Sequence, residues 1–255
     1  SIDEAFLDVT TDKKGIGSAT LIAKELKREI RRQTGLTASA GISFNKFLAK
    51  IASEIKKPDG IFIIKPDDAE KFINDLAVEK FFGIGKVTAA KMHKLGIHNG
   101  SDLKRMDLQS LVRNFGKVGK FYYDIVRGID DRPVEPESER KSIGTELTYE
   151  KDLTTRFQII AELYKVEKEL MERLKNADTT GRTITVKVKF SDFTQVTRSK
   201  TLPGFIRDFE TLHKEVSEIR KSLELEGSRI RLLGVSISNL ENEQPDNPQL
   251  ELFDV

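Results

Sequence analysis

The run from residue 183 to residue 191 alternates between apolar and polar side chains, and this pattern constrains the fold more than any other part of the sequence. The apolar positions are Ile184, Val186, Val188 and Phe190, and the residues between them are Thr, Lys and Ser. A period of two is that of a β-strand in a sheet with one buried face. The pattern therefore predicts a β-hairpin over residues 183–201 with one side turned toward a core.

The segments on either side of this hairpin extend it into a domain over residues 141–240. A strand is expected around 141–148, an amphipathic helix over about 155–177, a second helix over about 206–224 and a last strand over 229–240. This order of elements, β-α-β-β-α-β, is that of the split βαβ arrangement. The remaining residues, 241–255, are polar and rich in Pro and Asn, so they are expected to be disordered on their own.

Two further segments precede this domain. Residues 1–66 show the pattern strand, helix, strand, helix, strand, which is half of an α+β domain. Residues 67–133 are expected to be helical and to contain two glycine-rich turns. The acidic, proline-containing stretch that follows has the composition of an exposed linker, so a domain boundary is expected near residue 135.

The first nine residues, SIDEAFLDV, set two adjacent carboxylates into an apolar, strand-forming run. Such a run needs packing partners that a free terminus seldom supplies, so we expect the chain to be the C-terminal part of a larger protein. Neighbouring side chains on a strand point to opposite faces, and Asp3 and Glu4 can share a metal only at a turn. From the residues alone, a metal site and a solvated turn both remain open.

Composition limits the chemistry that is possible. The chain has no cysteine and only three scattered histidines, which excludes disulfides and makes a hard cation on oxygen ligands the expected metal. With no run of about 18 apolar residues, a soluble, cytoplasmic protein without a membrane partner is expected. The tail 241–255 carries five acidic residues and no basic one, whereas the body is basic. This suggests a polyanion partner for the body and a different partner for the tail, although a solvated charged surface explains the values equally well.

Two sets of residues are candidates for contact with phosphates. Gly83, Gly85 and Lys86 form the turn of a helix-hairpin-helix, in which backbone amides at a helix start bind phosphate, and Gly116 and Gly119 form a weaker copy; a plain αα-hairpin is the alternative. The second set is basic and is expected on the sheet face opposite the apolar positions or on neighbouring strands: Lys187, Lys189, Arg198, Lys200, Arg229 and Arg231. Lysines on strands also serve to prevent edge pairing, so from the residues alone this second set can have either role.

Several motifs follow one another in a recognisable order. The pattern S-x-D-E-x-x-L-D is complete at residues 1–8. It is followed by TASAGIS at 37–43, NKFLAKIAS at 45–53, KPDG at 57–60, GIGK at 83–86 and RKSIG at 140–144. Together these motifs resemble the Y-family DNA polymerases, the lesion-bypass enzymes, and within them the bacterial DNA polymerase IV branch. The resemblance covers essentially the whole chain.

The resemblance implies that the full protein adds deoxynucleotides to a primer 3′ end opposite damaged template, by phosphoryl transfer with two Mg²⁺ ions. Asp3 and Glu4 match two of the family's three metal carboxylates, which lie at the tip of a palm hairpin. Lys50 matches the lysine that contacts the triphosphate of the incoming nucleotide, and Lys46 is its neighbour. The first metal carboxylate, the fingers and the steric gate match nothing in this sequence, so the chain by itself is expected to be inactive.

The same resemblance implies an α+β multidomain protein. Its parts are the C-terminal part of the palm (1–66), a thumb that grips primer-template DNA (67–133), a linker (134–140), a little finger whose sheet lies along DNA phosphates (141–240) and a tail (241–255). In this family a C-terminal Q-L-x-L-F string resembles the peptide that docks into the sliding clamp, which implies clamp contacts at Gln249, Leu250, Leu252 and Phe253. We expect a monomer.

Two other classes of protein are alternatives. A non-catalytic DNA-binding and clamp-docking module would keep the thumb, the little finger and the tail. A palm-type nucleotide cyclase also uses paired acids near a hairpin, but nothing in that class explains the GIGK turn or the tail. Primer extension distinguishes the polymerase from the first alternative.

Overall fold

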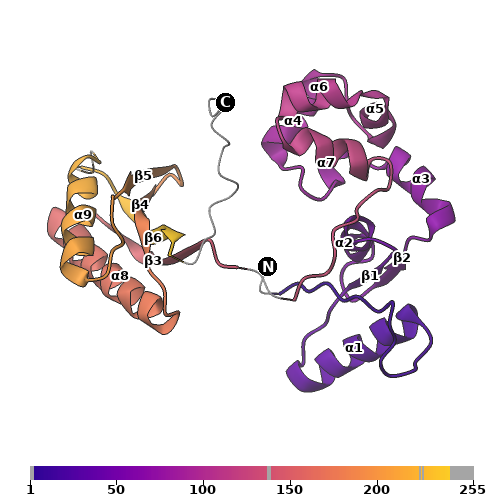
Figure 1. Cartoon of the computed structure of the whole chain (residues 1–255), viewed down its shortest axis with the longest axis horizontal. Helices are drawn as coiled ribbons and strands as arrows, with labels where there is room; N and C mark the ends of the chain where they lie inside the picture. Colours follow the sequence, from indigo (N-terminus) through magenta and orange to yellow (C-terminus); the bar gives the residue numbers. More distant parts are fainter. Residues whose placement is uncertain (1–2, 137–138, 224, 226, 242–255) are drawn as a thin grey trace, which may run out of the picture. The chain divides into compact units, whose positions relative to one another are not determined.

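The computed structural model describes residues 3–136, 139–223, 225 and 227–241. It divides into two compact units, Ser1–Pro136 and Glu137–Val255 (Figure 1). The expected boundary near residue 135 therefore lies next to the division between the units. The finer division of the first unit at residue 66 stays a prediction, because one hydrophobic core runs from Phe47 to Val126 across it.

The second unit is a four-stranded antiparallel sheet with two helices. The strands are β3 (Ser142–Leu153), β4 (Gly181–Phe190), β5 (Gln195–Thr201) and β6 (Ile230–Leu240), and their spatial order is β3-β6-β4-β5. The helices are α8 (Arg156–Asn176) and α9 (Phe209–Lys221). The observed order is β-α-β-β-α-β, which confirms the arrangement predicted from the alternating hairpin.

Local sequence sets where both helices begin. Thr155 and Gln158 form a capping box at the start of α8, and the side chain of Asp208 accepts the amide of Thr211 at the start of α9. The apolar face of α8 packs on β3 and β6, and α9 packs on β4 and β5. Both helices therefore cover the same face of the sheet, and the other face is left open (Figure 1).

A contact between a buried carboxylate and a partly exposed histidine joins the two helices. Glu167 of α8 is 1% exposed, and its carboxylate lies 2.6 Å from Nδ1 of His213 on α9. Burial raises the pKa of Glu167, and the contact with His213 offsets part of that rise. The pair satisfies a carboxylate that would otherwise be left without a partner in an apolar interface.

The first unit begins with a helix and a small parallel sheet. Its elements are α1 (Ala19–Thr34), β1 (Ala40–Ile42), α2 (Lys46–Ile55) and β2 (Ile61–Ile63), and β1 pairs with β2 in parallel. Ser18 caps α1, and Gly35 ends it at φ 74°. Helix α2 is the crossover between the strands and buries Phe47, Leu48, Ile51 and Ala52.

The rest of the first unit is helical. Helix α3 (Pro66–Asp75) and the 3₁₀ turn η1 (Val78–Lys80) lead into α4 (Lys86–Lys94), α5 (Gly100–Arg105), α6 (Leu108–Phe115) and α7 (Val118–Ile125). The rings of Phe47 and Phe81 lie 5.5 Å apart, which joins the crossover helix to these helices in one core.

Two expectations for the first unit differ from the structure. No strand occurs between residues 3 and 9, where Leu7 is 62% exposed. A β-prone run forms a strand only against a partner strand, and within the described residues β1 and β2 pair with each other alone. The second of the three strands expected in residues 1–66 is limited to Ala40–Ile42, because only these residues have partners on β2.

No helix in the described part of the chain is both long enough and apolar enough to cross a membrane.

The contact between α6 and α7 yields a stability prediction. A Cβ on Gly119 would lie 2.4 Å from the backbone carbonyl of Leu111, and backbone atoms cannot rotate away as a side chain can. We expect Gly119→Ala to lower the free energy of unfolding by about 2 kcal/mol or more. The control is Gly85→Ala, because a Cβ there would meet nothing within 4 Å. Urea denaturation followed by circular dichroism checks this, and equal stability of the two variants would contradict the packing role of Gly119.

Candidate functional site

The start of the chain meets helix α2 at an ion pair. Nζ of Lys50 lies 2.8 Å from Oε1 of Glu4 and 2.8 Å from Oε1 of Glu54, and the lysine side chain is 17% exposed. Partial burial acts to lower the pKa of Lys50, but the bonds to Glu4 and Glu54 outweigh it and raise the pKa. The structure therefore brings together Glu4 and Lys50, which are 46 residues apart and which the resemblance assigns to one active site.

These residues do not complete a metal site. Among the residues that the structure describes, no group of three or more His, Cys, Asp or Glu side chains is placed to hold a metal ion. Asp3 and Glu4 supply hard oxygen donors, which suit Mg²⁺, but one oxygen of Glu4 is already bound to Lys50. The donor set of the described residues thus does not by itself hold a pair of metal ions.

A buried carboxylate holds α2 against the end of the helical part. The side chain of Asp130 is 1% exposed and accepts hydrogen bonds from the amide of Phe47, at 2.8 Å, and from Arg132. Burial acts to raise the pKa of Asp130, but the bonds from Arg132 and Phe47 hold it below its usual range. Asn45 caps the same helix and donates to the carbonyl of Gly128. These contacts set where α2 begins, and hence where it presents Lys50.

The first glycine turn leads directly into helix α4. Gly83 has φ 91°, a conformation that favours glycine, and Gly85 is the residue before the helix. No side chain caps the start of α4, whereas Asn99 caps α5 and Asp107 caps α6. Val87, in the first turn, is 87% exposed. The uncapped amides and the positive end of the helix dipole can therefore take a phosphate oxygen.

The second glycine turn has a different arrangement. Gly116 ends α6 at φ 67°, but Gly119 is buried in α7, and its amide donates to the carbonyl of Gly116 at 2.9 Å. Packing accounts for Gly119: a glycine is needed there because α7 passes close to the backbone of Leu111.

The register of the second unit determines which residues face away from the helices. Thr185 lies opposite Ser199 on β5 and Ser236 on β6, and its hydroxyl is 2.8 Å from that of Ser199. Following the same register across the sheet gives an open face of mostly small or hydroxyl side chains, made of Ser142, Gly144, Glu146, Thr148, Thr183, Thr185, Lys187, Lys189, Gln195, Thr197, Ser199, Thr201, Leu232, Gly234, Ser236 and Ser238. We call this set the open face. Its one carboxylate, Glu146, is bound to Lys187 at 2.7 Å.

The same register places two of the predicted basic contacts away from the open face. Arg198 lies opposite Val186, and Lys200 lies opposite Ile184, so both are on the helix-covered side of the sheet. Lys200 is paired with Glu215 at 2.5 Å and Glu218 at 2.9 Å of α9. The sequence interpretation placed them with Lys187 because β5 is polar on both faces.

The remaining basic residues lie at one end of the sheet. Arg229 and Arg231 lie 3.3 Å and 3.9 Å from the carboxylate of Asp152. Lys189 and Arg231 both lie near the ring of Phe193, which is 65% exposed at the tip of the β4–β5 hairpin. The sequence interpretation did not select Phe193, although an exposed aromatic in a hairpin turn with φ 67° is an unusual feature.

Other functional candidates were missed or cannot be placed. The hydroxyls of the open face were not selected, although Thr183 and Thr185 alternate visibly with Ile184 and Val186. Glu54 was also missed, although it lies one helical turn after Lys50. The predicted clamp-binding residues Gln249, Leu250, Leu252 and Phe253 lie outside the described residues.

Three segments of the chain match known family descriptions. Residues 1–54 match the impB/mucB/samB family, and residues 66–97 match the IMS family HHH motif. Residues 140–252 match the impB/mucB/samB family C-terminal domain. The HHH match coincides with the turn that leads into α4, and the C-terminal match coincides with the second unit.

Similar proteins support the same grouping. DNA polymerase IV of Bacteroides fragilis is 51% identical over 247 residues, which are 97% of this chain and 68% of that protein. DNA polymerase IV of Clostridioides difficile is 45% identical and is matched over 100% of this chain and 70% of its own length. A solved Y-family DNA polymerase chimera of Dbh and Dpo4 superposes with a TM-score of 0.74 at 26% identity, over 87% of this chain and 64% of the chimera.

The chain thus spans about two thirds of the length of the proteins it matches. The matches agree in order and in type with the motifs at residues 1–8, 83–86 and 140–144. The chain belongs to the Y-family DNA polymerases, the translesion DNA-directed DNA polymerases, in the DNA polymerase IV branch.

Proposed function

We propose that this chain serves translesion synthesis by holding primer-template DNA with two phosphate-binding surfaces, the turn before α4 and the open face. The observation that carries the proposal is the composition of the open face. Its side chains are mostly hydroxyls and glycines, and its single carboxylate is neutralised by Lys187. Hydroxyls, backbone amides and lysines contact phosphates without reading sequence, which a polymerase requires of its DNA grip.

The edge of the sheet adds to this surface. Strand β5 is an edge strand, so its outer backbone groups have no strand partner within the described residues. Its side chains Thr197, Ser199 and Thr201 lie on the open face and are exposed. Lys189 and Phe193 continue the surface to the tip of the hairpin. A DNA backbone lying along β5 would thus meet hydroxyls, amides and one cation.

The turn before α4 is the second surface. Phe121 of α7 lies 3.4 Å from the position of a Cβ on Gly83, so the turn is supported from behind by the second helix pair. Lys86 is the first residue of α4, and its charge adds to the positive end of the helix. The expected ligand is a backbone phosphate of the duplex.

The open face can be tested with two neighbouring residues that lie on opposite sides of β5. Ser199→Glu and Arg198→Gln each change the charge by −1, but only Ser199 is on the open face. We expect Ser199→Glu to weaken binding to a labelled primer-template duplex about fivefold or more, because it opposes a phosphate contact, and Arg198→Gln to weaken it less than twofold. Fluorescence anisotropy at fixed salt measures both. The opposite order would overturn the assignment of the DNA-binding face.

The turn before α4 can be tested with a matched pair of helix-start variants. Val87 and Gln109 are the second residues of α4 and α6, and both are exposed, but Asp107 already caps α6. A glutamate near a helix start is favourable for the helix itself, so neither substitution should destabilise the fold. We expect Val87→Glu to weaken duplex binding about fivefold and Gln109→Glu to leave it within twofold, again by anisotropy. Equal effects would remove the turn from the DNA contact.

Catalysis is proposed only for a complete metal site. Asp3 and Glu4 are the proposed metal ligands for Mg²⁺, and Lys50 is the proposed contact to the triphosphate of the incoming nucleotide. The described residues contain no third carboxylate beside them in a metal-binding group. We therefore expect no primer extension by the 255-residue chain with Mg²⁺ and deoxynucleotides. Extension that Glu4→Ala abolishes would show instead that Asp3 and Glu4 suffice.

The tail is the proposed contact to the sliding clamp, which the family resemblance suggests and the acidic charge of residues 241–255 favours over contact with DNA. Competition by a synthetic peptide of residues 246–255 is the measurement that checks it. The peptide should displace the chain from a clamp, and a peptide with Leu252 and Phe253 replaced by alanine should not.

We further propose that the protein acts in the cytoplasm as a monomer. Sedimentation of the purified chain tests the oligomeric state.

A further inference from the structure

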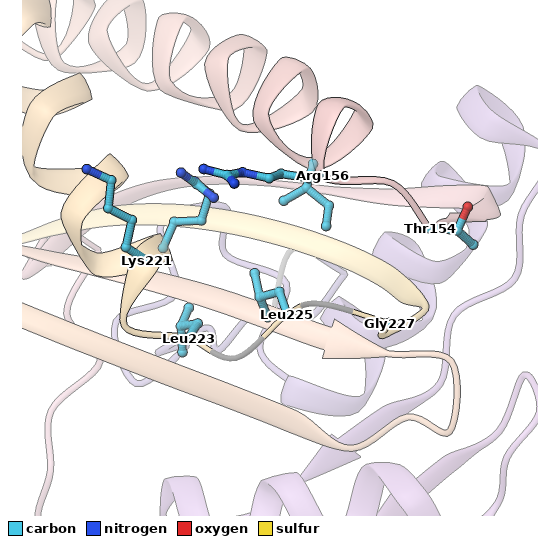
Figure 2. A pocket seen from close by; sticks show the side chains of 8 residues that line it. Thr154, Arg156, Lys221, Leu223, Leu225 and Gly227 are labelled. Atoms are coloured by element: carbon cyan, nitrogen blue, oxygen red, sulfur yellow. The ribbon is translucent and has the colours of Figure 1, made fainter.

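A cavity of about 450 Å³ opens in the second unit where the first turn of α8 meets the last turn of α9. Three cationic side chains line it: Arg156 of α8, and Arg220 and Lys221 of α9. Apolar side chains, among them Leu223 and Leu225, form the opposite wall. Figure 2 shows Arg156 and Lys221 extending along one side of the cavity, with Leu223 and Leu225 on the other.

Several other arginines of the unit have carboxylate partners. Arg173 lies 2.6 Å from Glu169, Arg207 lies 2.6 Å from Glu241, and Arg229 lies 3.3 Å from Asp152. Within the described residues, no carboxylate lies within ion-pair distance of Arg156, Arg220 or Lys221. Two glutamates of the neighbouring loop, Glu224 and Glu226, are outside the described residues. The cavity therefore presents three positive charges that form no ion pair with a described carboxylate, although the charge of Glu218 on α9 acts on Lys221.

The electrostatics of the cavity favour an anion. Arg220 is half-buried, and this burial, together with the nearby charge of Arg156, lowers the pKa of Arg220. Desolvation of Arg220 and its repulsion from Arg156 both disfavour the charged form of Arg220. A bound anion would offset both of these costs.

The shape and lining narrow the class of anion. Guanidinium groups bind phosphate oxygens in pairs, and three cations match a multiply charged phosphate better than a single carboxylate. The volume is in the range of small-molecule sites, about 300–1,000 Å³. The apolar wall, which includes Ile159, suits an organic group attached to the phosphate.

We propose that this cavity binds a phosphate group carried on an organic moiety, as in a nucleotide or in the backbone of single-stranded nucleic acid. The residues that line it belong to α8, to α9 and to the loops next to them. These helices cover the face of the sheet opposite to the open face. The cavity is therefore separate from the proposed duplex-binding surface, and its occupancy does not depend on the metal site.

The test is isothermal titration calorimetry of the whole chain at low salt with three probes: pyrophosphate, deoxythymidine 5′-monophosphate and single-stranded oligo(dT). We expect saturable binding that Arg220→Gln and Arg156→Gln each weaken about tenfold or more. The control is Lys214→Gln, which removes one exposed charge from α9 away from the cavity and should change the affinity less than twofold. Arg156 is exposed, so its variant keeps the test valid if Arg220→Gln does not fold.

The three probes separate the sources of the phosphate. Arginine-dependent binding that is tightest for the mononucleotide supports a free nucleotide, and binding that is tightest for oligo(dT) supports a nucleic-acid backbone. Binding of pyrophosphate alone supports the phosphate site but removes the organic moiety from the proposal. Absence of saturable binding of all three probes, or equal losses in Lys214→Gln, would overturn it.

Discussion

The pairing register of β4 with β5 and β6 is the constraint on which the second unit depends. Because side chains alternate along a strand, one register places Ile184, Val186 and Val188 under α8 and α9 and leaves Thr183, Thr185 and Lys187 on the other side. A shift by one residue would expose the core and bury the hydroxyls. The register that forms the core therefore also forms the surface that we propose to bind DNA.

In the first unit the comparable constraint is the start of α2. The side chain of Asn45 accepts the amide of Leu48, and the side chain of Asp130 accepts the amide of Phe47, so both fix where α2 begins. Lys50 is thereby presented to Glu4, while Phe47 packs on Phe81 next to the turn that leads into α4. The candidate catalytic residues and one proposed phosphate site thus share a single core.

Much of the fold could be predicted from the sequence, and the failures have physical causes. The order of elements in the second unit follows from period-two and helical patterns. The sequence could not show on which side of the sheet Arg198 and Lys200 lie, because β5 has polar residues at almost every position. Val196 is the one residue of β5 whose type indicates the buried side. It lies opposite Val188, on the same side of the sheet as Arg198 and Lys200. Gly119 could not be separated from a phosphate-binding glycine, because only the backbone of Leu111 shows what it packs against.

Hydrogen exchange of the chain with and without duplex DNA measures most directly whether the open face is the surface that binds DNA. Our account predicts that DNA slows exchange in β5 and in the first turn of α4, while the outer sides of α8 and α9 stay unchanged. Protection confined to α8 and α9, with β5 and α4 unaffected, would contradict it.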